Sequence, residues 1–100
     1  NSQNINEHIS YQKASVVSKE MVNKPSGTIT LFAFDRRQGL SEHKAPFDAL
    51  VIITDGTAEI VVSEIKHIVK AGEMLLIPAN ATHALKAIEP FKMILTMIKS

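Results

Sequence analysis

The sequence predicts an all-β domain of two antiparallel sheets, and three observations support this prediction. Apolar and β-branched residues recur with a period of two in short runs. Glycine, proline, asparagine and aspartate separate these runs at short intervals, which is typical of a sandwich or barrel. No segment after Lys13 has the spacing of an amphipathic helix.

Length and composition exclude several classes of protein. The chain has 100 residues, of which 45% are hydrophobic, enough for the core of one globular domain. The absence of cysteine excludes a disulfide scaffold, a thiol nucleophile and a cysteine-ligated zinc site. With a net charge of +1, we expect no nucleic-acid and no membrane partner. Because the first ten residues are polar and no apolar run reaches about 20 residues, we expect a cytoplasmic protein.

The N-terminal half predicts an arm, a buried strand and a hairpin. Residues 1–13 are polar and lack periodicity, so we expect a loose arm or a loop that leads into a single domain over residues 14–100. The run 28–34 is largely apolar on both faces, which suits a strand buried on two sides. The runs 48–54 and 57–63 flank Asp55-Gly56. Because this dipeptide suits a type I′ turn, in which both central residues have positive φ, we predict a tight hairpin there.

The C-terminal half predicts four more strands, over residues 65–70, 73–77, 83–88 and 91–98. Ala71-Gly72 and Pro78-Ala79-Asn80 mark the turns between them. Alternate residues of the last strand form one apolar face, made of Phe91, Met93, Leu95 and Met97. The alternation predicts six well-buried side chains, those of Val51, Ile53, Ile60, Val62, Leu76 and Leu95.

Histidines are the most promising chemical groups in the chain. His8 lies in the polar arm, where we expect it to be solvated, and His67 alternates with apolar residues of a strand, where a structural role is favoured. His43 and His83 each lie where a buried strand meets a loop. Two such imidazoles on paired strands would form a shared site, since imidazole is a common metal ligand and titrates near neutral pH. For Asp48 we expect a carboxylate that fixes its loop by hydrogen bonds.

The sequence resembles a small single-domain cupin from about Ala14 to Lys99. The second cupin motif has Gly, five residues, Pro-x-Gly, two residues and His, and the segment GEMLLIPANATH, from Gly72 to His83, matches it at that spacing. Asn80 stands for the motif's second glycine, which a left-handed backbone position tolerates. Counted back from Gly56, the first motif places its two histidines on His43 and Ala45 and its glutamate on Ala49.

The resemblance implies a double-stranded β-helix of jelly-roll topology. Cupins commonly hold Fe, Mn, Ni or Zn with three histidines and one glutamate, and only two of those four ligand positions carry histidine here. The resemblance and strand alternation together place His43, Ala45, Phe47, Ala49 and Val51 on one inner face. We therefore expect a pocket lined by His43, Phe47, His83 and Met93, in which His43 and His83 hold at most a weakly bound divalent transition metal ion.

Three functions remain open from the sequence. The first is a small-molecule-binding cupin with an apolar pocket and a degenerate metal site. The second is a metal-dependent enzyme of oxygenase or isomerase type, and the third is a structural or interaction module with a filled barrel. We also expect a homodimer, because small cupins commonly pair and because residues 29–34 are apolar on both faces.

Overall fold

The computed structural model describes residues 1–99, and its regular secondary structure consists of β-strands and one short 3-10 helix. A short 3-10 helix, η1 (Ile5–Glu7), precedes eight strands: β1 (Val16–Lys24), β2 (Gly27–Phe34), β3 (Gly39–His43), β4 (Asp48–Val62), β5 (Ile65–Lys70), β6 (Met74–Ile77), β7 (His83–Lys86) and β8 (Phe91–Ile98). The all-β prediction is therefore confirmed. Over these residues no helix is long and apolar enough to cross a membrane.

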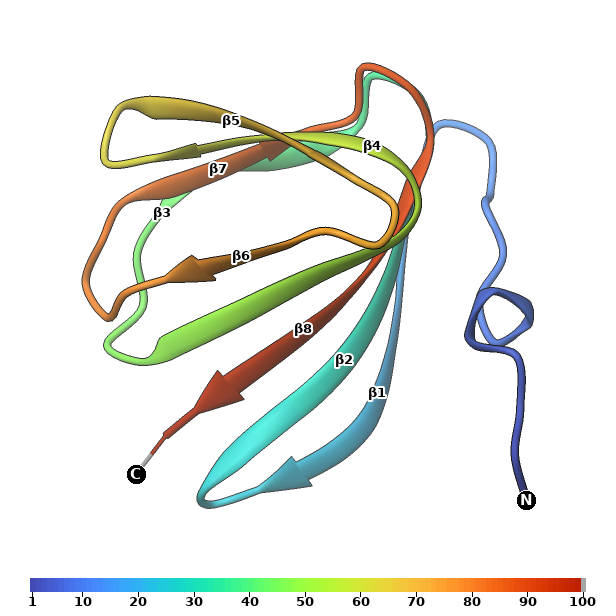
Figure 1. The fold of residues 1–100 in the computed structure, drawn as a ribbon, viewed down its shortest axis with the longest axis horizontal. Helices are drawn as coiled ribbons and strands as arrows, with labels where there is room; N and C mark the ends of the chain where they lie inside the picture. Colours follow the sequence, from blue (N-terminus) through green and yellow to red (C-terminus); the bar gives the residue numbers. More distant parts are fainter. Residues whose placement is uncertain (100) are drawn as a thin grey trace.

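Strand β4 organises the fold because it belongs to both sheets. Its first part, residues 48–56, pairs with β8 and, along residues 49–52, with β6. Its second part, residues 57–62, pairs with β5 and, from residue 59 onward, with β7. Sheet A therefore has the strand order β1-β2-β8-β4-β6, and sheet B has the order β3-β7-β4-β5. Figure 1 shows the two sheets as facing layers joined where β4 bends.

The predicted hairpin at Asp55-Gly56 is wrong, since β4 runs without a break through both residues. Gly56 does have the expected positive φ, of 73°, but it lies next to an irregularity in the pairing of β4 with β8. A side chain at Gly56 would collide with the carbonyl oxygen of Pro90, the residue just before the neighbouring strand β8. Glycine is needed here for a close approach at the bend and not for a reversal of the chain.

The true hairpin follows β4 at Ser63 and Glu64, with φ values of 47° and 70°. Positive φ at two successive residues fits the primed turns that close antiparallel pairs. Neither residue is a usual choice for this turn, so the sequence signal pointed to the wrong place. The pairing of Val62 with Ile65 closes the hairpin.

Strands β1 and β3 were not predicted. Both lie at sheet edges, and most of their side chains are exposed. A strand at an edge needs fewer apolar residues, so the period-two signal is weak there. Strand β7 also ends at Lys86, two residues earlier than predicted.

The core lies between the two sheets. Its large, fully buried side chains include Phe34, Ile53, Ile60, Phe91 and Met93, and the rings of Phe34 and Phe91 stack with centroids 4.4 Å apart. Burial of Val51, Ile53 and Ile60 is confirmed, whereas Val62 and Leu95 are only half-buried. Leu76 was predicted wrongly, because it is 63% exposed. Its neighbours Leu75 and Ile77 face the core, which leaves Leu76 on the outer face of sheet A.

The N-terminal arm packs against the outer face of sheet A. Ile9 is buried against Leu31 and Ala33 of β2. The Asn6 side chain donates to the carbonyl oxygen of Thr54 at 2.8 Å, and the Lys92 ammonium donates to the Asn6 carbonyl oxygen at 2.6 Å. The arm therefore covers one end of this face and provides a partner for a buried lysine.

Candidate functional site

One end of the barrel gathers several strand ends and two loops. At this end β3 leads through residues 44–47 into β4, and β6 leads through residues 78–82 into β7. The backbone amide of Asn80 donates to the carbonyl oxygen of Ala45 at 2.8 Å. Asp48 accepts from the amide of Ala79 at 2.9 Å, so its predicted role in fixing the loop is confirmed. Asn80 has a φ of 66°, the left-handed conformation expected where the motif has glycine.

The structure brings His43 and His83 together at this end. The two residues are direct cross-strand partners on β3 and β7. Their ring centroids lie 4.2 Å apart, and the ring planes meet at 61°. A register shift between Leu40 and His43 adds a residue to β3, which places both His43 and Leu40 on the side of Leu85 and the core. His43 is exposed and His83 is half-buried, so the pair lies at the rim of the barrel.

Backbone carbonyl groups fix the protonation of both rings. His43 Nδ1 lies 2.7 Å from the carbonyl oxygen of Ser41, and His83 Nδ1 lies 3.0 Å from that of Ala81. A carbonyl oxygen can only accept, so each Nδ1 must carry the proton and donate it. In the neutral state each Nε2 therefore bears a free lone pair. The two imidazoles together offer two hydrogen-bond acceptors or two metal ligands.

The strand predicted to run through residues 43–51 is interrupted, although the predicted alternation of burial persists. Strand β3 ends at His43 and β4 begins at Asp48, so Ala45 and Phe47 lie in the loop between them. The loop is held by the hydrogen bonds to Ala79 and Asn80, and its exposure still alternates, with Ala45 and Phe47 half-buried and Lys44 and Pro46 exposed. The ring of Phe47 is half-buried. The ammonium of Lys99, the residue after β8, lies over this ring at 5.7 Å from the ring centroid.

The structure places Met93 deeper than Met97. Met93 is 2% exposed in the core and pairs with Ile53, whereas Met97 is half-buried and pairs with Ala49 at the start of β4. Of the two inward-facing methionines, Met97 is therefore the one at the end of the barrel where the histidines lie. Met93 and Met97 both face inward by strand alternation. Only the register of β8 with β4 shows which of them lies level with the start of β4.

Thr28 is a polar residue of this end that sequence reasoning missed. It pairs with Met97 and shares the inner face of β2 with Phe32 and Phe34. It is 6% exposed, and its hydroxyl group has no hydrogen-bond partner. An unpaired buried hydroxyl costs about 1–3 kcal/mol of stability. Threonine is common in strands, so its position in the sequence did not indicate that its hydroxyl is buried without a partner.

The other two histidines lie elsewhere. His8 contacts Gln3 and lies 3.2 Å from the ammonium of Lys19 in the N-terminal arm region. His67 is half-buried on β5, where it pairs with Ile60.

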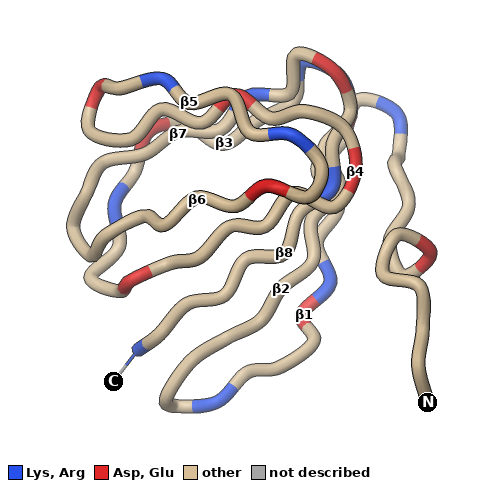
Figure 2. Tube along the Cα trace, viewed as in Figure 1, with Lys and Arg blue, Asp and Glu red and all other residues tan. Residues whose placement is uncertain are grey.

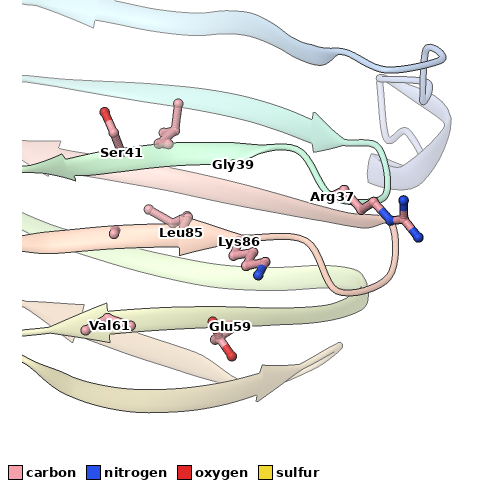
Figure 3. A pocket seen from close by; sticks show the side chains of 9 residues that line it. Arg37, Gly39, Ser41, Glu59, Val61, Leu85 and Lys86 are labelled. Atoms are coloured by element: carbon pink, nitrogen blue, oxygen red, sulfur yellow. The ribbon is translucent and has the colours of Figure 1, made fainter.

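A separate shallow groove crosses the outer face of sheet B (Figure 3). It has a volume of about 370 Å³ and runs over Gly39, Ser41, Glu59 and Lys86. Three small residues, Gly39, Ser41 and Ala84, lie in its lining beside the longer side chains of Arg37 and Lys86. Neither imidazole contributes to it, and Glu59 is engaged with Lys66 at 3.3 Å. We therefore place the candidate site at the histidine pair.

The fold and the position of the histidine pair can now be compared with known proteins. The sequence matches the cupin domain family over residues 31–98. The chain belongs to the cupin family. A cupin 2 conserved barrel domain protein from Leptotrichia buccalis is 42% identical, with a TM-score of 0.94. The match covers 97% of this chain and 47% of that protein's chain. This chain thus spans about half of that protein.

Two further solved structures are similar to this cupin. A conserved protein of unknown function from Streptococcus pyogenes is 30% identical with a TM-score of 0.96, covering 100% of this chain and 88% of its own. A cupin superfamily protein from Desulfitobacterium hafniense is 25% identical, with a TM-score of 0.92. That match covers 96% of this chain and 88% of the other protein's chain. No curated protein matches the chain.

The residues of this cupin do not fit a four-ligand metal centre. Within residues 1–99 no group of three or more His, Cys, Asp or Glu side chains lies close enough to hold a metal ion. Ala45 and Ala49 stand at the two other positions that the motif gives to metal ligands. Two neutral imidazoles supply neither the charge nor the coordination number of a strong site.

Proposed function

We propose that this cupin binds a small organic molecule that carries hydroxyl or N–H groups at the end of its barrel. The observation that carries the proposal is the pair of imidazoles whose Nδ1 protons are committed to Ser41 and Ala81. The two remaining Nε2 atoms accept hydrogen bonds, so a complementary ligand supplies donors.

The surroundings favour a ligand that is otherwise apolar. Leu75, Leu95 and Met97 are half-buried residues that pack on the core between the two sheets. Sites of this kind use a few polar groups to orient a ligand and apolar walls to bind it. Phenols and short alcohols combine these properties and are suitable probes.

The test is an NMR titration of the full chain with a set of phenols, alcohols and carboxylates. We expect donor-bearing probes to shift the imidazole signals of His43 and His83 together, and His43→Ala and His83→Ala to lose at least tenfold in affinity. His67→Ala is the matched control, since His67 is also half-buried but lies on β5.

Two outcomes would contradict the proposal. Probes that shift only Arg37 and Lys86 would move the site to the groove on sheet B. Equal binding by wild type and both histidine variants would remove the imidazoles from recognition. A parallel titration with Zn²⁺ alone tests the metal-dependent alternative, because tight binding by wild type would favour that alternative over our proposal.

A further inference from the structure

We propose that a recess between the N-terminal arm and the outer face of sheet A binds a small carboxylic acid that has an apolar chain. The recess has a volume of about 350 Å³. Small-molecule sites typically have volumes of roughly 300–1,000 Å³, so this volume suits a ligand of that kind. Neither His43 nor His83 lines the recess, and the proposal is therefore independent of the function proposed above.

Apolar side chains of sheet A form the floor of the recess. Ile29 and Leu31 come from β2 and Ile94 comes from β8, and Leu31 pairs directly with Ile94. Figure 2 shows no charged residue along the middle parts of these two strands. Leu31 is buried, but Ile29 and Ile94 are only half-buried, so part of the floor stays accessible. An apolar chain that lies on this floor is removed from water, which favours binding.

The arm forms one wall of the recess and is fixed to the sheet by its own contacts. Ile5 and His8 belong to the lining, and Ile5 packs against the cluster that buries Ile9. The Tyr11 hydroxyl donates to the Asp55 carboxylate at 2.6 Å, which holds the end of the arm in place. Figure 1 shows the arm running beside β1. The wall is therefore preorganised, which reduces the entropy lost when a ligand binds.

The ammonium of Lys19 lies at the rim of the recess. Lys19 pairs with Leu31 across β1 and β2, so both side chains lie on the same face of sheet A. Its Nζ atom lies 3.2 Å from Nδ1 of His8, a residue of the lining. Glu20, the next residue of β1, lies on the opposite face and accepts from the Asn23 side chain at 3.1 Å. Within residues 1–99 no carboxylate oxygen lies within ion-pair distance of the Lys19 ammonium, so its charge remains for a ligand.

Two polar contacts fix the ammonium in this position. Gln3 Oε1 contacts His8 Nε2, and because an amide oxygen can only accept, Nε2 carries the proton and donates it. Nδ1 of the neutral ring then accepts a hydrogen bond from the Lys19 ammonium. This contact uses one N–H group of the ammonium and leaves the others for carboxylate oxygens.

This combination of charge and apolar surface selects the class of ligand. A monocarboxylate carries one negative charge, which the Lys19 ammonium balances through charge-assisted hydrogen bonds. A phosphate monoester carries about two charges near neutral pH and would need a second cation, whereas the lining contains no lysine or arginine. Hexanoate and octanoate are suitable probes, and hexanol has the chain of hexanoate without its charge.

An NMR titration of the full chain with hexanoate tests the recess. We expect saturable amide shifts at Ile5, Ile29 and Ile94, which line it. We expect no shifts at His43 or His83, because a carboxylate has no hydrogen-bond donor for their Nε2 atoms. His43→Ala and His83→Ala should therefore bind hexanoate like wild type, so failure of the histidine site and failure of the recess are distinguishable.

Substitutions of Lys19 test the contact with the carboxylate. Lys19→Met keeps the apolar stem and should weaken hexanoate binding at least about tenfold, while hexanol binding stays unchanged. Lys19→Arg keeps the charge and should bind hexanoate like wild type. Lys24→Met is the matched control, since Lys24 is also exposed on β1 but does not line the recess.

Any of three results overturns the proposal. The first is the absence of saturable shifts in the recess. The second is hexanoate binding by Lys19→Met that equals that of wild type, or an equal loss of hexanoate and hexanol binding in that variant. The third is shifts in the recess that follow the protein concentration and not the hexanoate concentration, because a second copy of the chain would then cover the floor.

Discussion

His43 and His83 face each other across β3 and β7, and each donates its Nδ1 proton to a carbonyl oxygen two residues earlier in the chain. The same local geometry thus occurs twice. It commits the donor of each ring to the backbone and leaves the acceptor of each ring free, as our proposed function requires.

The first prediction concerns the tautomer of this pair. At a pH where both rings are neutral, we expect the Nδ1–H form for His43 and His83. Nitrogen-15 chemical shifts of the imidazoles, measured through their ring protons, distinguish the two tautomers directly. Finding the Nε2–H form in both rings would contradict the hydrogen bonds to Ser41 and Ala81.

Thr28→Val should raise stability. The hydroxyl is buried without a partner, so replacing it with a methyl group of similar shape removes a desolvation cost of about 1 kcal/mol. Thermal denaturation measures the gain. A clear loss of stability would show that the hydroxyl is satisfied in the folded protein.

Gly56→Ala should destabilise the protein far more than Gly72→Ala. Both glycines have positive φ, of 73° and 89°, which costs an L-residue about 1–2 kcal/mol. A Cβ at Gly72 meets no atom within 4 Å, whereas one at Gly56 collides with Pro90 and lies 2.9 Å from Phe91 Cα. Urea denaturation measures the loss of unfolding free energy in each variant, and the difference between the two losses is the steric cost at Gly56. Equal losses would mean that β8 does not approach the bend this closely.

Changing Ser63-Glu64 to Asn-Gly should stabilise the hairpin between β4 and β5. Both residues adopt positive φ, which Asn and Gly do with less strain. We expect a gain of about 1 kcal/mol in the free energy of unfolding, measured by urea denaturation. A loss would indicate that the chain does not reverse at these residues.

The contact of the arm with the sheet should weaken at high pH. Partial burial, together with the hydrogen bond from the Tyr11 hydroxyl to Asp55, raises the pKa of Tyr11 above its usual value. A raised pKa favours the protonated form in the folded state, so its stabilisation is complete below pH of about 10 and is lost above it. Tyr11→Phe should remove this part of the pH dependence. Amide exchange of residues 5–12 reports the release.

Much of the fold could be predicted from the sequence because strand alternation is a local property. The runs of apolar residues located β2, both parts of β4, β5, β6 and β8, and the second motif indicated the left-handed position of Asn80. Edge strands β1 and β3 were missed because their side chains are mostly exposed and leave little period-two signal.

The sequence by itself determined that the chain is all-β, that Gly56 needs a left-handed backbone, and that two histidines lie at strand ends. Alternation separates two faces of a strand but does not say which face is inside, so only the tertiary structure placed Leu76 outside and Leu75 inside. The site depended on long-range register in the same way. The extra residue in β3 decides that His43 meets His83, and the register of β8 decides that Met97, and not Met93, lies level with the start of β4.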